Sequence, residues 1–339
     1  MSMVYDVPPI TSENDPSVKS VNQFVLRITR AAIPGTHLVE VLPWMKYIPG
    51  RFASWKREAM KWFAHDSVSF EQLFNTVRER RAAGDTRPSF AATLIEESRR
   101  HGLSERENAW LSAALYATGT DTTASTLSWW MLAMIVYPET QRLAHAELDA
   151  NVGRSRPPRF SDIENLPYVR AMVKEILRWQ PVYRITVLHS SNEDDWYDRY
   201  FIPAGSTVIA NTWFLNRDPE VYGADAEHFN PARHLDSSGR AAPGPVDTKE
   251  EGHVTYGFGP RICVGRHFAN NTLFINIAMM LWALNIEQGI DDKGHLLPFD
   301  LNGCVDYGLV VRPIPFECKI TPCFPDVASI LEQERELLR

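Results

Sequence analysis

One cysteine, Cys263, stands near the end of a glycine-rich segment, residues 256–265, which reads YGFGPRICVG. Apolar residues recur after this segment at the spacing of one helix face, from Phe274 through Ile277 to Leu281. We therefore expect Cys263 just ahead of a helix N-terminus. There the helix dipole and the free N–H groups favour a thiolate over a thiol.

The residues around Cys263 indicate what such a thiolate would hold. Gly257, Gly259 and Gly265 allow positive φ angles and let a flat group approach the backbone closely. Arg261 adds a planar cation that can bind a carboxylate. Together they suit a haem, whose iron takes an axial ligand and whose propionates need a cation. The alternative is a glycine turn that holds a buried thiol in the core.

An acid and an alcohol, Asp121 and Thr122, lie in the middle of a second predicted element. Ser104 and Glu107 form a capping box before an apolar run, which predicts a helix of about thirty residues. Gly119 and the threonines around it favour a bend in that helix, because threonine hydroxyls bond back to carbonyls. An acid and an alcohol at a bend can form a route for protons. The alternative is a buried helix whose hydroxyls satisfy themselves.

A charged pair, Glu175 and Arg178, lies on a helix predicted for residues 167–179. Their i, i+3 spacing brings the two side chains together. Glu175 also lies at the edge of the apolar face of this helix, three residues after Met172. The pair is therefore either a buried structural pair or an exposed ion pair, which contributes little stability.

The other elements follow from periodicity and turn residues. Further helices are predicted for residues 21–32, 55–81, 89–101, 138–150 and 326–339. Strands are predicted for residues 196–202 and 207–210, joined around residues 203–205, and for a hairpin of 305–313 with 316–320. We expect residues 1–20 to be irregular and residues 237–251 to form a loop. The apolar residues 44–48 either roof an active site or form a loop that is pinned to the core.

Composition excludes several classes of function. The chain has 339 residues, 44% of them hydrophobic, and a net charge of −7, which argues against nucleic acid as a partner. Its 4 cysteines are too few and too scattered for a disulfide scaffold. The polar N-terminus is neither a signal peptide nor a membrane anchor. The most apolar window, residues 109–136, contains Asp121 and several hydroxyl residues, which argues against a membrane span.

Four motifs in order resemble the cytochrome P-450 family, the haem-thiolate monooxygenases. They are the cysteine loop, the Gly-x-Asp-Thr stretch from Gly119, the Glu-x-x-Arg pair, and the Asn-Pro-Ala-Arg-His stretch of residues 230–234. Residues 190–195 and 216–219 look like those of fungal multi-purpose oxidases. The chain departs from the family pattern at a few positions, which are Thr118, Arg184, Leu188, His234 and Tyr256.

The resemblance implies a mainly α fold with small β sheets, in which residues 1–339 form a single partial haem-thiolate monooxygenase domain. It implies Cys263 as the axial ligand of haem, with Arg261 and His189 at the propionates. His189 is alternatively a surface loop histidine. Asp121 and Thr122 would relay protons to dioxygen. An NADPH-dependent reductase would supply electrons, and an apolar small molecule would be hydroxylated.

The resemblance also implies a buried triad of Glu175, Arg178 and Arg233. Family members begin with a membrane anchor, a further sheet and several helices. The residues before Val21 cannot supply these elements. Such full-length members sit at the cytosolic face of the endoplasmic reticulum membrane, whereas a chain without the anchor is expected in the cytoplasm. The alternative to an enzyme is a non-catalytic fragment or incomplete gene product. We expect the chain as given to bind haem poorly, although it has the ligand cysteine.

Overall fold

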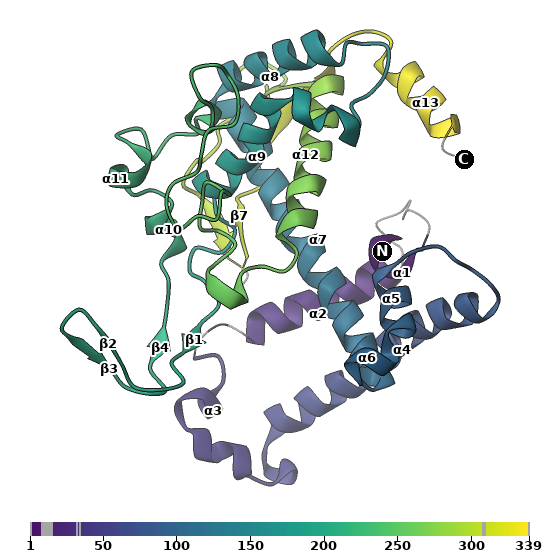
Figure 1. Cartoon of the computed structure of the whole chain (residues 1–339), viewed down its shortest axis with the longest axis vertical. Coiled ribbons are helices and arrows are strands. Elements are labelled where there is room, and N and C mark those ends of the chain that lie inside the picture. The colour runs from purple at the N-terminus through teal and green to yellow at the C-terminus, as the bar shows by residue number, and fades with distance from the viewer. Residues whose placement is uncertain (1, 8–15, 32, 34, 307–309, 338–339) are drawn as a thin grey trace. The chain divides into compact units, whose positions relative to one another are not determined.

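The computed structural model describes residues 2–7, 16–31, 33, 35–306 and 310–337 (Figure 1). Contacts divide the chain into two compact units, residues 1–122 and residues 123–306 with 310–339. The division falls within the long helix α7, Glu105–Val136. This helix therefore contributes its first part to one unit and its last part to the other. Helices dominate and the sheets are small, which confirms the predicted fold class.

The described residues of the first unit are helical or irregular, without strands. Before α7 its helices are α1 (Ser2–Tyr5), α2 (Pro16–Ala31), α3 (Leu38–Val41), η1 (Pro43–Tyr47), η2 (Gly50–Phe52), α4 (Ser54–Ala82), α5 (Phe90–Glu96) and α6 (Ser98–His101). The helix predicted over 55–81 is thus confirmed as α4. The helix predicted over 89–101 is two helices, because the chain turns at Glu97, where φ is −90° and ψ 12°.

The expectation that residues 1–20 are irregular is wrong for their described part, which is helical in α1 and from Pro16 onward. The side chain of Tyr5 is completely buried, and Arg80 donates hydrogen bonds to the carbonyl groups of Tyr5 and Asp6. The burial of Tyr5 and the hydrogen bonds from Arg80 therefore keep α1 in place, although the polar composition of the N-terminus predicts no helix there. The helix predicted over 21–32 is confirmed as part of α2, except that residue 32 lies outside the described residues, as do residues 8–15.

Aromatic rings of α2, α4 and α7 form the core of the first unit. The rings of Phe24 and Phe70 lie 5.1 Å apart, and Trp110 contacts both edge to face. Residues 44–48 do not belong to this core, because Trp44 is 61% and Tyr47 76% exposed. The interpretation of these residues as a loop pinned to the core is therefore wrong, and their role as a roof stays a prediction.

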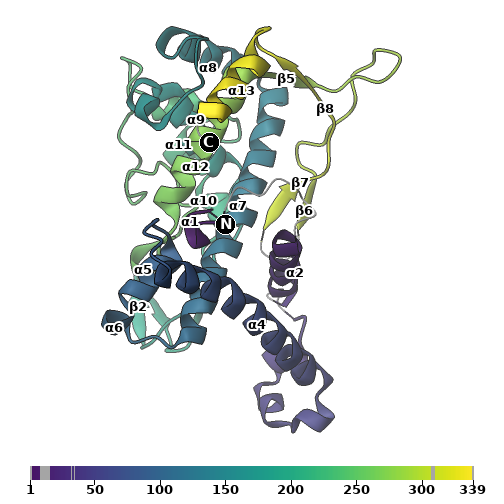
Figure 2. The ribbon, with the colours of Figure 1, turned by 90° about the vertical axis from the view of Figure 1, so that its right-hand side faces the viewer.

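The second unit contains further helices besides the last part of α7. They are α8 (Pro138–Asn151), η3 (Phe160–Asn165), α9 (Pro167–Trp179), α10 (Thr212–Leu215), α11 (Pro219–Tyr222), η4 (Pro231–His234), η5 (Gly259–Arg261), α12 (Arg266–Ala283) and α13 (Val327–Leu337). Helix α12 runs beside α9, and both contact α8 (Figure 2). Trp129 and Trp130 of α7 are completely buried, as are Ile176 of α9 and Ile277 of α12. The helices predicted over 138–150, 167–179 and 326–337 are confirmed; residues 338–339 lie outside the described part.

Eight short strands form four two-stranded antiparallel sheets among the described residues. The pairs are β1 (His189–Ser190) with β4 (Thr207–Val208), β2 (Asp195–Tyr197) with β3 (Tyr200–Ile202), β5 (Leu284–Gln288) with β8 (Cys318–Pro322), and β6 (Cys304–Asp306) with β7 (Val311–Pro313).

The structure corrects both predicted strand pairs. The segment 196–202 is itself a hairpin, because the chain turns at Asp198, whose φ is 53°. The segment 305–313 is likewise two strands, with residues 307–309 outside the described part. Residues 318–322 pair with the strand that follows α12 instead. Such pairings join segments far apart in sequence, which local patterns do not specify.

Candidate functional site

The cysteine loop lies directly ahead of α12, as the sequence predicts. The amide of Cys263 donates a hydrogen bond of 2.8 Å to the carbonyl of Tyr256, which closes the loop on itself. The short helix η5 lies between these two residues, and the side chain of Cys263 is exposed. A buried thiol held in the core is therefore excluded. The loop presents the sulfur outward at the start of a helix.

The glycines of the loop serve different purposes. Gly257 and Gly259 have φ angles of 76° and 57°, the left-handed region that glycine occupies without strain. A Cβ at either would meet no atom within 4 Å, so the backbone there is open to an approaching group. For Gly265 the expectation of a positive φ is wrong, because its φ is −84°. A Cβ at Gly265 would lie 3.9 Å from the sulfur of Cys263, an ordinary contact.

Two side chains, those of Arg261 and His189, could donate hydrogen bonds to a carboxylate. Arg261 ends η5, and His189 lies on β1, opposite Val208 of β4; both side chains are exposed. Within the part of the chain that the structure describes, neither side chain has an ion-pair or hydrogen-bond partner. Arg261 and Cys263 share one loop, while His189 comes from a separate strand pair. An exposed thiol, a guanidinium and an imidazole are a set of groups that fits haem and its propionates.

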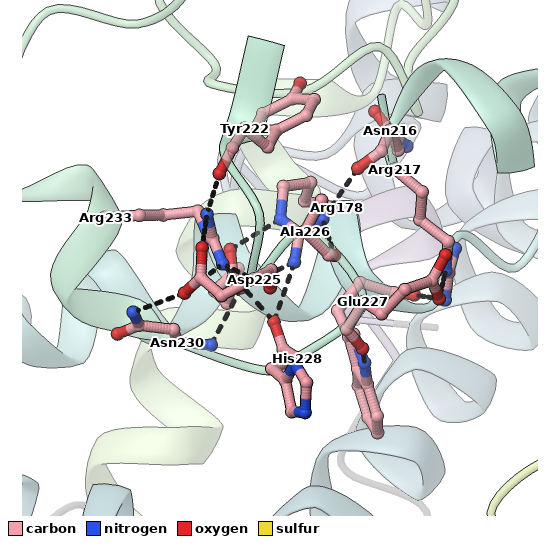
Figure 3. Close-up of polar contacts among 12 residues, drawn as sticks. Arg178, Asn216, Arg217, Tyr222, Asp225, Ala226, Glu227, His228, Asn230 and Arg233 are labelled. Carbon is pink, nitrogen blue, oxygen red and sulfur yellow. Dashed lines mark hydrogen bonds and ion pairs between the residues drawn. The ribbon is translucent and has the colours of Figure 1, made fainter. Parts of the chain in front are cut away.

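The buried triad predicted for Glu175, Arg178 and Arg233 is confirmed. Figure 3 shows its two arginines with carbonyl groups that they also contact. Arg178 donates two hydrogen bonds to Glu175, of 2.8 and 2.7 Å, and both side chains are completely buried. Arg233 donates to the same carboxylate at 3.0 Å. The interpretation as an exposed pair is therefore excluded. Arg178 also donates to the carbonyls of Asn216, Ala226 and His228. These hydrogen bonds hold residues 216–228, which include α11, against α9.

His234 is a fourth member of this cluster that sequence reasoning missed. Its Nε2 lies 2.9 Å from Glu175 Oε2, and its ring is buried. Gly252 permits this position, because a Cβ there would lie 2.9 Å from the ring nitrogen Nδ1. Burial raises the pKa of Glu175, but hydrogen bonds from Arg178 and His234 outweigh it and lower the pKa to about 2. Burial lowers the pKa of His234, so a neutral ring donates to the carboxylate.

Asn216 connects the triad to the start of the cysteine loop, and sequence reasoning missed this role as well. Its carbonyl accepts from Arg178, while its side chain accepts from the amide of Val254 and donates to the hydroxyl of Thr255. Thr255 in turn donates to the carbonyl of Leu177 in α9. The buried ion cluster thus holds the chain just before the loop. No local sequence signal could indicate this, because the partners are 38 or more residues apart.

A buried histidine, His253, lies at the entrance of the same loop. Its Nδ1 accepts from the amide of Thr255, its ring lies 5.1 Å from that of Tyr256, and burial lowers its pKa to about 3. Its Nε2 has no protein partner among the described residues. A cavity of about 740 Å³ lies beside the loop and is lined in part by His253, Tyr256 and Gly257.

Asp121 and Thr122 lie in α7, within the first unit, whereas the cysteine loop belongs to the second. Both side chains are partly exposed. The hydroxyl of Thr122 donates to the carbonyl of Thr118 at 2.8 Å, and the hydroxyl of Thr118 bonds back in the same way to Ala114. Bonding to carbonyls four residues earlier agrees with the alternative of self-satisfied hydroxyls. A part in proton delivery stays a prediction.

Arg184, one of the departures noted in the sequence, is fixed by an aromatic ring. Its guanidinium lies 4.1 Å from the ring centre of Trp213, and that of Arg217 lies 3.3 Å from the same ring. Burial lowers the pKa of Arg217 to about 10, although the carboxylate of Glu227 opposes this.

Among the described residues, no helix is both long enough and apolar enough to cross a membrane.

Comparisons with known proteins point to one family. The sequence model of the cytochrome P-450 family matches residues 8–314. Two cytochrome P-450 monooxygenases of Armillaria gallica are 64% and 59% identical over the whole chain, which covers 65% and 66% of their lengths. The chain thus spans about two thirds of the length of these curated relatives.

A solved structure of a zebra fish cytochrome P-450 with abiraterone has the same fold. The TM-score is 0.72 at 22% sequence identity, over 96% of this chain and 69% of that one. The family model covers most of the chain, and the cysteine loop and buried triad have the geometry that the motifs predict. The chain belongs to the cytochrome P-450 family.

Proposed function

We propose that the protein is a haem-thiolate monooxygenase that hydroxylates an apolar small molecule with dioxygen and electrons from an NADPH-dependent reductase. The observation that carries this proposal is the exposed thiol of Cys263, which stands at the end of a closed glycine loop directly ahead of α12. Relatives named cytochrome P-450 monooxygenases support it. Haem, when bound, would supply the chemistry that activates dioxygen.

Cys263 would bind the haem iron as its axial ligand. The bond from its amide to Tyr256 fixes the backbone, so the sulfur projects from a defined position. Arg261 and His189 would bind the propionates, since both are exposed and lack partners in the described part of the chain. Gly257 and Gly259 adopt positive φ angles and carry no side chains, so the loop would leave room for a flat ring.

Asp121 and Thr122 would deliver protons while dioxygen is reduced. The Thr122 hydroxyl donates to Thr118 in this structure, and a rotation about χ1 would release it to another acceptor. Asp121 is partly exposed and adjacent in sequence, so it can exchange protons with solvent. An acid beside an alcohol is the arrangement that general acid catalysis requires.

The direct test supplies the haem-loaded protein with NADPH and a fungal reductase and screens apolar substrates for hydroxylated products. We expect product that depends on dioxygen and NADPH, and none from Cys263→Ser. Cys318→Ser is the matched control, because Cys318 lies on β8 and is more shielded. Equal product from the two variants would show that Cys263 does not hold the reactive centre.

A further inference from the structure

The residue that opens the cysteine loop, Tyr256, carries a hydroxyl that is bonded to the helix behind the loop. The hydroxyl donates to Oδ1 of Asn270 in α12 at 2.7 Å. The Nδ2 of Asn270 then donates to Oε2 of Glu251 at 2.8 Å. The hydroxyl of Tyr256 thus begins a chain of side-chain hydrogen bonds. Tyrosine hydroxyls that are shielded from water usually find such a partner.

The chain of contacts returns to the ligand residue itself. The guanidinium of Arg266 lies 3.8 Å from Oε1 of Glu251 and also donates, at 3.4 Å, to the carbonyl of Cys263. The amide of Cys263 is bonded to the carbonyl of Tyr256. Hydrogen bonds and one ion pair therefore form a closed circuit through Tyr256, Asn270, Glu251, Arg266 and Cys263.

Burial makes this circuit stiff. The side chain of Glu251 is 13% exposed and that of Arg266 is 27% exposed, so water competes weakly for the pair. The ring of Tyr256 packs at 5.1 Å from His253, which is itself 2% exposed.

We propose that Tyr256 is a positioning residue for Cys263. Its hydroxyl ties the start of the loop to the second turn of α12, while Arg266 ties the end of the loop to the first turn. The two ends of the loop are thereby held to one rigid helix, which fixes the direction in which the sulfur projects. Groups that orient a metal ligand commonly tune its bond to the metal. This inference rests on the proposed role of Cys263 as a haem ligand.

The variant Tyr256→Phe removes only the hydroxyl and keeps the ring. Tyr222→Phe is the matched control, because Tyr222 also donates a buried hydroxyl bond, at 3.2 Å to Gly252, and does not belong to the loop. In the chain without haem, amide exchange of residues 257–265 should be about fivefold faster in Tyr256→Phe, the usual consequence of losing one hydrogen bond. It should be unchanged in Tyr222→Phe. Equal exchange in both variants would overturn the proposal.

A second readout uses the haem-loaded protein. The reduced carbon-monoxide complex of Tyr256→Phe should convert to the form without thiolate several-fold faster than that of Tyr222→Phe. Asn270→Ala breaks the same bond from the helix side, so the double variant should convert no faster than Asn270→Ala alone. If the unaltered protein shows no thiolate signature, the proposed role of Cys263 fails, and amide exchange alone decides whether Tyr256 holds the loop. Additive effects of Tyr256→Phe and Asn270→Ala would contradict the circuit.

Discussion

Removal of the Arg178 side chain should strongly lower the stability of the second unit. Arg178 makes two bonds to Glu175 and three to the carbonyls of Asn216, Ala226 and His228, and it is completely buried. In Arg178→Ala the buried carboxylate loses its bidentate partner, which typically costs about 3–5 kcal/mol. Domains are stable by only about 5–15 kcal/mol, so little folded protein should remain.

The matched control is Arg142→Ala. Arg142 pairs with Glu139 at the same i, i+3 spacing, in α8, but its side chain is 66% exposed. Urea unfolding, followed by the fluorescence of the buried tryptophans, measures the free energy of unfolding of each variant. We expect Arg142→Ala to match the unaltered chain. A loss of less than about 1 kcal/mol in Arg178→Ala would refute the reasoning, because solvated ion pairs contribute amounts of that size.

Three further predictions concern pH, backbone conformation and proton delivery. The pKa of Glu175 is lowered from 4.5 to about 2, so the stability that Glu175 contributes is present above pH 4.5 and is lost as the pH falls towards 2. Unfolding curves of Glu175→Gln should lack this loss, and an equal loss in that variant would contradict the prediction. Gly257→Ala should lower the free energy of unfolding by about 1–2 kcal/mol, because alanine is strained at a φ of 76°. Gly265→Ala, at a φ of −84°, should be nearly neutral in the same urea assay, and equal losses in the two variants would argue against strain. Thr122→Ala should divert NADPH electrons to peroxide more than it weakens substrate binding, and unchanged product per NADPH would leave the hydroxyl a structural role.

Local patterns predict the elements that bury a periodic face. Helix α9 has its predicted bounds because Pro167 starts it and its apolar positions repeat at helical spacing. The capping box before α7 is also confirmed, since the amide of Ser104 donates to Glu107 at 2.7 Å and the amide of Glu107 to Ser104 at 3.3 Å. In such elements a residue and its partners lie within one turn, so the sequence contains the whole signal.

Pairings across the chain could not be predicted in this way. β5 and β8 are separated by 29 residues, which include β6 and β7, and either strand alone favours several partners. His234 and Asn216 look like loop residues until the fold brings them against Glu175 and Val254. The motif residues Glu175, Arg178 and Arg233 were predictable only through the family resemblance, because the spacing alone also permits an exposed pair.

The most direct test of the central claim is the absorption spectrum of the reduced carbon-monoxide complex after reconstitution with haem. Cys263→Ser and Cys318→Ser each remove one thiol, and haem stoichiometry is measured on the same samples. We expect the thiolate signature in the haem-bound fraction of the unaltered protein and of Cys318→Ser, and its loss in Cys263→Ser. A thiolate signature that survives in Cys263→Ser, with haem still bound, would contradict the assignment of Cys263 as the axial ligand.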